Sequence, residues 1–300
     1  MHLAAGPGVS EHGLARRAAL LLLVALLRPA APLRAADLKP ATATAYEQYV
    51  QAAEAQIARR RAAGRPLYID NLPANERAKA LAEIKRGDIH TAPVDVRDEN
   101  GKALDIPDGM VHHWVGTAFI PRATLDDTMG VMFNYERYRD TYKPEIVESR
   151  LLSRGDGDLK VYMRLQKKTS WVSVTLDCDF DVDYRRADER HAYSETRAIR
   201  IQQVENAGRP DEHKDPIGHD SGYVWGINTF WSVEQEADGV IIEWESVTLS
   251  REIPFLLRWA ARPYIAHVAR ETVTDMLTNS RATVARSLKA PAATPQKPAP

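Results

Sequence analysis

The chain has 300 residues, 44% of them hydrophobic, and its 40 basic and 41 acidic side chains give a formal net charge of −1. This length and apolar content allow one or two domains with a substantial core. No basic block stands out, which argues against nucleic-acid binding. Cys178 is the only cysteine, so no internal disulfide can form. At an apolar strand position it is typical of a small core residue rather than a nucleophile.

The first 36 residues have the pattern of a secretory signal peptide. Arg16 and Arg17 precede an apolar run, 18–27, and the stretch ends in small residues at Ala35 and Ala36. The run is too short to span a bilayer. We therefore expect residues 1–36 to direct export of the protein to the periplasm or the medium, with no stable membrane span after cleavage. The alternative is an uncleaved N-terminal anchor.

Residues 37–110 are predicted to form a helical lead-in that packs on the main domain. Apolar residues at helical spacing indicate one helix over 41–63 and a second over 73–86. Gly64 and Gly87 follow these helices and suit their C-terminal ends. Residues 88–110 contain turn signals and are expected to be an irregular connection.

From residue 111 the pattern changes to strands. We expect a strand at 112–120 and two short helices within 123–142, separated at Gly130. The strands predicted after them are 145–152, 159–168, 171–184, 190–204, 222–236 and 240–251. In 171–184 apolar residues alternate with serine, threonine and aspartate, which predicts one buried and one wet face.

The last helical run, 253–288, carries an apolar stripe at spacings of three and four residues. Because Pro263 lacks a backbone donor, we expect a short helix over 255–261 and a long helix starting at Pro263. That helix needs an apolar surface, and the sheet needs a cover. The fold class is therefore α+β: a curved antiparallel sheet of about seven strands wrapped on a long C-terminal helix. Residues 289–300 are expected to be a disordered tail.

The order of these elements resembles the helix-grip fold of the START/SRPBCC superfamily, also called Bet v 1-like, and in particular its secreted bacterial branch. The resemblance covers about 111–288 and is carried by four stretches: HHWVG at 112–116, YERYRDTYKP at 135–144, EIVESRLL at 145–152 and LSREIP at 249–254. It implies a hydrophobic cavity between sheet and C-terminal helix that holds lipids, sterols or polyketide-like molecules. Members of the superfamily include carriers and cyclase- or hydrolase-type enzymes, so the fold leaves function open.

The strand 240–251 places Glu243 and Glu245 on the same face as Val247 and Leu249. If that face lines the cavity, the two carboxylates could act as acid and base, with Arg164 and His113 as further catalytic candidates. The alternative is that Ile242 and Trp244 face inward and the glutamates are solvated.

Other side chains are candidates for ligand binding rather than chemistry. Aromatic and aliphatic residues of strand 222–236 and of the terminal helix could line an apolar pocket. These residues are Tyr223, Trp225, Ile227, Trp231, Tyr264, Val268 and Met276. The loop 206–221 holds metal-ligand types at loose spacing with Lys214 among them, so no metal site is predicted. No cofactor motif is present either.

We therefore expect an exported binding protein for a hydrophobic small molecule. The first alternative is a cyclase- or hydrolase-type enzyme that uses carboxylates in the same cavity. The second is a structural or interaction protein of the cell envelope.

Overall fold

A computed structural model of the chain describes residues 36–98, 100–155, 157–168, 173–253 and 255–289. Of these, the side chains of 255–263 are not described. The predicted signal peptide, apart from Ala36, and the predicted tail after residue 289 lie outside the described residues. No helix within the described ranges is both long and apolar enough to cross a membrane.

The centre of the fold is an antiparallel sheet whose main path has eight strands, in the order β2-β3-β11-β10-β7-β6-β5-β4. The strands span β2 His90–Pro93, β3 Gly109–Pro121, β4 Ile146–Arg154, β5 Asp158–Lys168, β6 Ser173–Arg186, β7 His191–Glu205, β10 Gly226–Glu236 and β11 Gly239–Arg251. Seven of them match the predicted strands. The pairing of β3 with β11 joins the first and last of these seven, as a sheet wrapped around a helix requires.

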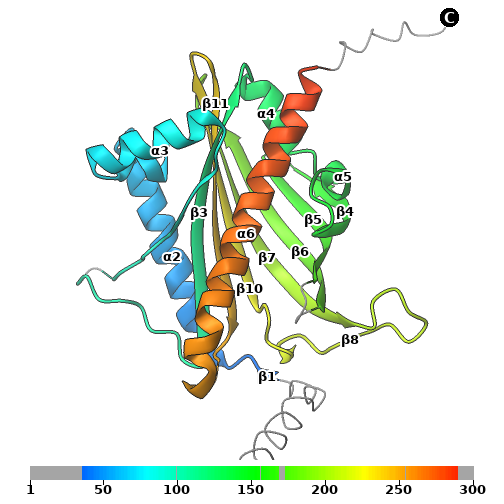
Figure 1. The fold of residues 1–300 in the computed structure, drawn as a ribbon. Coiled ribbons are helices and arrows are strands. Elements are labelled where there is room, and N and C mark those ends of the chain that lie inside the picture. The colour runs from blue at the N-terminus through cyan, green and yellow to red at the C-terminus, as the bar shows by residue number, and fades with distance from the viewer. Residues whose placement is uncertain (1–35, 99, 156, 169–172, 254, 290–300) are drawn as a thin grey trace, which may run out of the picture. The chain divides into compact units, whose positions relative to one another are not determined.

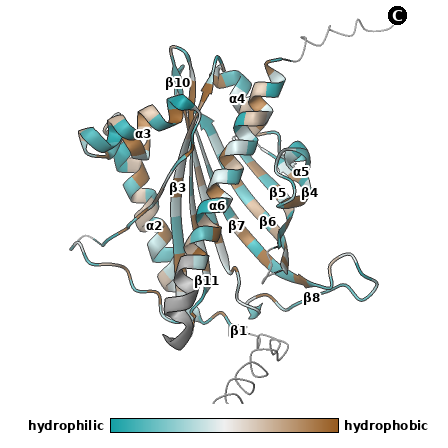
Figure 2. Cartoon of the chain, viewed as in Figure 1, coloured by the Kyte–Doolittle hydropathy of each residue, from teal (hydrophilic) through white to brown (hydrophobic). Residues whose placement is uncertain are grey.

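The C-terminal helix α6 (Phe255–Ser287) crosses one face of this sheet, which we call the inner face (Figure 1). It packs on β3 so closely that a Cβ on Gly116 would touch Val273 and Leu277. The architecture is therefore the predicted α+β helix-grip fold. Hydrophobic positions recur along the strands behind α6 (Figure 2), as the alternating sequence pattern requires.

The N-terminal helices cover the opposite, outer face of the sheet. They are α2 (Pro40–Ala62), the short 3-10 helix η1 (Tyr68–Asn71) and α3 (Ala74–Arg86). Tyr46 of α2 donates from its hydroxyl to the backbone oxygen of Val247, 2.9 Å away, and Val50 and Ile57 are buried in the same cluster. The lead-in therefore packs on the sheet as expected, but on the face away from α6.

Short helical segments between β3 and β4 cover the rest of the inner face: the first packs beside α6 over β7 and β10, and the two that follow lie over β4. α4 (Leu125–Met132) begins with a capping box in which Thr124 and Asp127 satisfy each other's backbone groups. The predicted break at Gly130 is wrong, because α4 continues through it to Met132 and the turn follows Phe133. Next come η2 (Tyr135–Arg137) and α5 (Tyr138–Thr141). The buried Cys178 lies in the cluster beneath these elements.

Helix α6 differs from its prediction as well. Its backbone is helical from Phe255 without interruption, so the expected division at Pro263 is wrong. Loss of one backbone donor is tolerated within a helix of this length. None of the side chains at 264–272 is fully buried, whereas Val273, Leu277, Ser280 and Val284 are. The second half of α6 therefore carries the close packing on the sheet.

Two regions predicted as irregular contain short strands. β2 lies within 88–110 and extends the sheet beyond β3. In the loop 206–221, β8 (His213–Lys214) pairs with β7, and β9 (His219–Asp220) pairs with β1 (Ala36–Asp37). Isolated pairs this short leave no periodic pattern in the sequence, which is why the prediction missed them.

The predicted wet face of β6 is wrong at two positions. Thr175 and Asp177 belong to that face, yet Thr175 is 5% exposed and Asp177 is fully buried. Lys214 of β8, in the loop that covers this end of the outer face, forms an ion pair with Asp177. The loop therefore shields part of a face that alternation alone assigns to solvent.

Candidate functional site

The two carboxylates predicted on one face of β11 are indeed neighbours, but they face α2 rather than α6. Glu243 and Glu245 share the outer face with Val247, whereas Ile242 and Trp244 pack in the inner cluster under α6. Of the two possibilities left open by the sequence, the one in which Glu243 and Glu245 line the cavity is therefore wrong. The alternative, that Ile242 and Trp244 face inward, is right. Its second part, that the two glutamates are solvated, is wrong, because Glu243 is 2% and Glu245 is 3% exposed.

Glu245 lies at the centre of a buried chain of polar contacts. Arg60, near the C-terminal end of α2, donates from Nη2 to its Oε2, and His113 Nε2 lies 2.8 Å from its Oε1. The other ring nitrogen of His113 lies 3.1 Å from the Tyr49 hydroxyl. Burial alone would raise the pKa of Glu245, but the His113 hydrogen bond and the Arg60 guanidinium lower it below its usual value. This carboxylate is therefore ionised and paired.

Glu243 is held differently. It accepts the Tyr68 backbone N–H at 2.9 and 2.8 Å and the Thr117 hydroxyl at 3.1 Å. Burial raises its pKa to about 8, opposed by Arg60 and reinforced by Glu245. The first residue of η1 is thereby tied to the middle of β11. One protonated and one ionised carboxyl, both sealed beneath α2, suit attachment of the lead-in better than catalysis on a substrate under α6.

The fourth catalytic candidate lies elsewhere. Arg164 of β5 binds Asp177 through Nε at 2.7 Å and Nη2 at 3.0 Å, and it also reaches Glu212. Lys214 and the Tyr162 hydroxyl complete the surroundings of Asp177. Burial would raise the pKa of Asp177, but these partners hold it well below its usual range. The structure thus joins Glu243, Glu245 and His113, and it places Arg164 in a separate ion cluster.

The predicted ligand-binding residues fall into two groups. On the inner face, Trp231 is buried, and Tyr223 and Ile227 pack half-buried against the cluster beneath α5. Trp225 instead packs in the cluster beneath α2, and its indole N–H donates to Asp220 at 3.0 Å. The backbone bends before β10 begins at Gly226, so alternation cannot be extended back to this residue.

On α6 the three predicted residues differ in burial. Met276 is half-buried and contacts both inner-face clusters. Val268 is half-buried as well, and Tyr264 is 36% exposed. Met276 therefore lies between the two clusters, whereas Tyr264 and Val268 lie on the loosely packed half of the helix.

The middle of the inner face holds small and hydroxylated residues that the sequence prediction did not single out. On β7 they are Ala192, Ser194, Thr196 and Ala198, each two residues from the next. Small side chains at the centre of a sheet leave room between it and its covering helix. The available signal was this alternation of small residues within the predicted strand 190–204.

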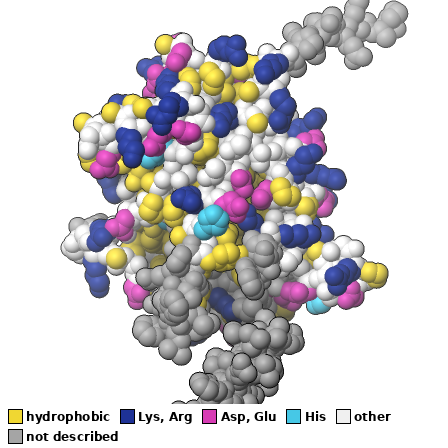
Figure 3. All heavy atoms as spheres, in the orientation of Figure 1, with side chains coloured by type: hydrophobic (Ala, Val, Ile, Leu, Met, Phe, Trp, Pro, Cys, Tyr) yellow, Lys and Arg dark blue, Asp and Glu magenta, His cyan; other side chains and the backbone are white. Residues whose placement is uncertain are grey.

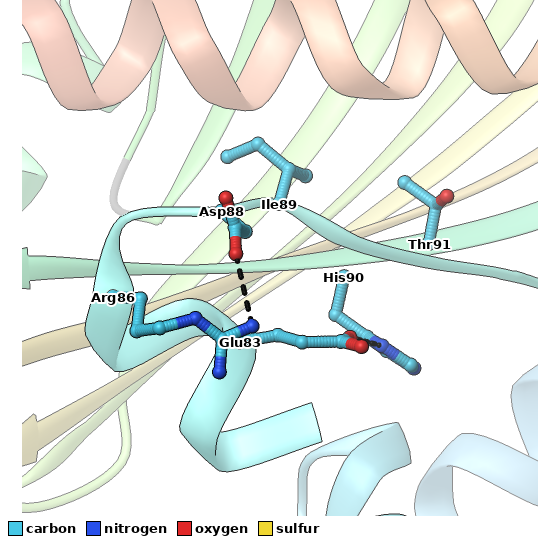
Figure 4. Close-up of a pocket in the computed structure, with 6 residues that line it drawn as sticks. All are labelled: Glu83, Arg86, Asp88, Ile89, His90 and Thr91. Atoms are coloured by element: carbon cyan, nitrogen blue, oxygen red, sulfur yellow. Dashed lines mark hydrogen bonds and ion pairs between the residues drawn. The ribbon is translucent and has the colours of Figure 1, made fainter. Parts of the chain in front are cut away.

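A hollow of about 430 Å³ lies where α3 meets β2 (Figure 4). It is lined by Glu83, Arg86, Asp88, Ile89, His90 and Thr91. His90 Nδ1 lies 2.9 Å from Glu83, and Arg86 donates to Asp88 at 3.2 Å. Its largely polar lining does not suit an apolar ligand. Within the described ranges no three His, Cys, Asp or Glu side chains gather as a metal ion would require.

Comparison with models of known protein families gives no match, and neither does comparison with curated proteins. Among solved structures, the chain is similar to a fragment of the STAR-related lipid transfer protein from Xanthomonas axonopodis, with 18% identity and a TM-score of 0.42 over 61% of this chain and 97% of that one. It is also similar to the Zhui aromatase/cyclase from Streptomyces sp. R1128, with 14% identity and a TM-score of 0.43 over 60% and 98%. Human STARD10 gives 10% identity and a TM-score of 0.43 over 73% and 84%. By its own strand order and C-terminal helix, this chain has a START-like, helix-grip fold.

Proposed function

We propose that this protein binds a hydrophobic small molecule between α6 and the inner face of β5, β6, β7 and β10. The observation that carries the proposal is a set of apolar side chains that point into the layer beneath α6 and are nevertheless only half-buried. They are Leu165, Ala198, Ile227 and Met276. In a closely packed core such residues would have no accessible surface.

The neighbouring part of the same face supports this interpretation by contrast. Where α6 meets β3 and β11, Ile242, Leu277 and Val284 have no exposed surface. The helix and the sheet are thus in full contact along one side and leave apolar surface accessible along the other. An apolar molecule bound there would remove that surface from water, at about 25 cal/mol for each Å².

Lipid extraction and mass spectrometry of the purified intact chain test the proposal. We expect a hydrophobic compound to copurify at a substantial fraction of the protein concentration. After extraction, the neutral dye Nile red should bind with a blue-shifted emission. Absence of both a copurified compound and dye binding would contradict the proposal.

A pair of variants locates the site. Ala198→Trp fills the proposed space and should abolish dye binding, while Leu152→Trp, at a residue that is 52% exposed on β4, should leave it unchanged. Circular dichroism confirms that each variant folds. Equal dye binding by both variants would place the dye elsewhere.

We further propose that the chain is exported, on the basis of the N-terminal sequence pattern. Cell fractionation and N-terminal sequencing of the mature protein test this. Recovery in the cytoplasm with an intact N-terminus would contradict it.

A further inference from the structure

A row of hydroxyl groups crosses the middle of the inner face. Ser246 of β11 is paired with Thr229 of β10, and Thr229 is paired with Thr196 of β7. Ser194 lies two residues before Thr196 and therefore points to the same side. Three adjacent strands thus present hydroxyl groups toward α6 at the centre of an apolar layer.

Tyr135 of η2 completes the row from the opposite side. It is 3% exposed, and its hydroxyl lies beside those of Thr196 and Ser194. Burial raises the pKa of Tyr135, so its hydroxyl stays protonated and able to donate a hydrogen bond. We call these five residues (Ser194, Thr196, Thr229, Ser246 and Tyr135) the hydroxyl row.

Ser194 shows that the hydroxyl row is incomplete within the protein. Its side chain is 1% exposed, and its Oγ lies near the Tyr135 hydroxyl without forming a well-aligned hydrogen bond in the described part of the chain. A buried hydroxyl without a partner costs free energy, so such groups normally meet a protein group, water or a ligand. Ser194 Oγ is therefore available to a polar atom that enters the layer.

In the described part of the chain, the two cationic side chains at the strand ends of the inner face, Lys167 and Arg186, are already paired. Lys167 at the end of β5 lies 3.6 Å from Glu145 and 3.3 Å from Glu271 of α6, and Arg186 pairs with Asp126 of α4. Figure 3 shows a group of acidic side chains on the side of the molecule that α6 crosses. A carboxylate or phosphate carried to the hydroxyl row would lose its hydration without gaining a counter-ion, whereas a hydroxyl or carbonyl group would gain hydrogen bonds.

We propose that the hydroxyl row is the polar subsite of the hydrophobic site, and that its ligand is a neutral molecule with a hydroxyl or carbonyl oxygen rather than an anion such as a fatty acid. This inference rests on the proposed function.

Three probes with one carbon skeleton test the subsite on the intact, extracted chain: retinol, its hydrocarbon counterpart anhydroretinol, and the anion retinoate. We expect the wild type to bind retinol more tightly than retinoate. The variant S194A/T196V should lose about 3- to 10-fold in retinol affinity and keep its anhydroretinol affinity, as the loss of a net hydrogen bond predicts. Ser232→Ala removes a buried hydroxyl of the outer face, where the side chain is 6% exposed, and should bind all three probes as the wild type does.

The possible results distinguish a failure of the polar subsite from a failure of the hydrophobic binding site as a whole. If retinol and anhydroretinol lose affinity equally in S194A/T196V, or if neither loses any, the proposed subsite is wrong while hydrophobic binding stands. Tightest binding of retinoate by the wild type would also overturn the subsite. If no probe binds, anhydroretinol included, the hydrophobic site itself fails.

One readout needs no ligand. Because Ser194 Oγ forms no well-aligned hydrogen bond within the described protein, Ser194→Ala should leave the Tm of the ligand-free chain unchanged or raise it. A fall of several degrees, without a similar fall for Ser232→Ala, would show that Ser194 already has a partner inside the protein and would overturn the inference.

Discussion

The two faces of the sheet are both covered by helices, yet they are built in opposite ways. Beneath α2 the outer face buries Arg60, His113, Glu243 and Glu245 among apolar residues and ties them together by hydrogen bonds. Beneath α6 the inner face is largely apolar, and several of its side chains keep exposed surface. The comparison shows that the buried ionisable groups of the outer face hold α2 on the sheet. The accessible apolar surface that could bind a ligand lies on the inner face.

Burying charged groups costs free energy. We therefore expect the polar cluster of Arg60, His113, Glu243 and Glu245 to fix the position of α2 on the sheet more than to raise the net stability. Arg60 illustrates this: its Nη2 binds Glu245, while its Nε and Nη1 have no hydrogen-bond partner in the described ranges. The packing of α2 on the sheet should therefore be sensitive to the loss of any one residue of this cluster.

Removing the cation should have the largest effect. Arg60→Met would leave Glu245 buried beside His113 without its guanidinium partner, and we expect a loss of roughly 3–5 kcal/mol in the free energy of unfolding. Urea denaturation measures it. Arg59→Met, at the exposed preceding residue, should change stability by less than about 0.5 kcal/mol. Equal effects of the two variants would contradict the role given to the cluster.

The protonated carboxyl should make stability depend on pH. The pKa of Glu243 is raised from its usual 4.5 to about 8 in the folded chain. Its contribution is therefore fully present below pH 4.5 and is lost as the pH rises toward 8. Between these values the wild type should lose about 1.4 kcal/mol per pH unit relative to Glu243→Gln, which keeps a neutral side chain.

Unfolding titrations of the two proteins at pH 5, 6, 7 and 8 measure this slope. Glu136→Gln, at an exposed residue of η2, is the control and should run parallel to the wild type. A constant difference between Glu243→Gln and the wild type would show that Glu243 is already ionised at pH 5.

The close contact between α6 and β3 can be tested with glycines. A Cβ on Gly116 would touch Val273 and lie 2.6 Å from Leu277, so Gly116→Ala should cost about 1–3 kcal/mol. Gly130→Ala meets nothing within 4 Å inside α4 and should instead stabilise by about 0.5–1 kcal/mol. Thermal unfolding shows whether each variant is less or more stable than the wild type. An unchanged Tm for Gly116→Ala would mean that α6 does not pack closely on β3 at this position.

The smallest expected effect concerns the accessible part of the inner face. Ile227→Ala should destabilise by about 1 kcal/mol, because half-buried Ile227 leaves little cavity behind. Ile242→Ala, at a fully buried position on the same face, should cost about 2–5 kcal/mol. Similar losses in urea denaturation would show that both positions are equally well packed.

Much of this architecture could be predicted from the sequence because it depends on local periodicity. The alternation from Val172 to Tyr184 and the stripe through Val273 and Val284 define a sheet and its covering helix. Gly87 ends α3 in the left-handed conformation, as its position predicts. The continuous helix through Pro263 was missed because the loss of one backbone donor indicates a helix boundary, whereas a long helix can continue through it.

The site was harder to predict because it depends on which face each helix covers. Alternation places Glu243 and Glu245 with Val247, but it cannot tell whether α2 or α6 lies above them. Both helices carry apolar residues, so either could cover either face. Arg164 pairs with Asp177 across neighbouring strands, and that register depends on the whole sheet. Ser194 has no local signal beyond its small size.

The most direct test of the central claim is a crystal structure of the intact chain as purified from its producing cells. We predict continuous electron density for an apolar molecule in contact with Ala198, Ile227 and Met276, between α6 and the inner face of the sheet. An inner face closed by its own side chains, with no density between α6 and β7, would contradict the account.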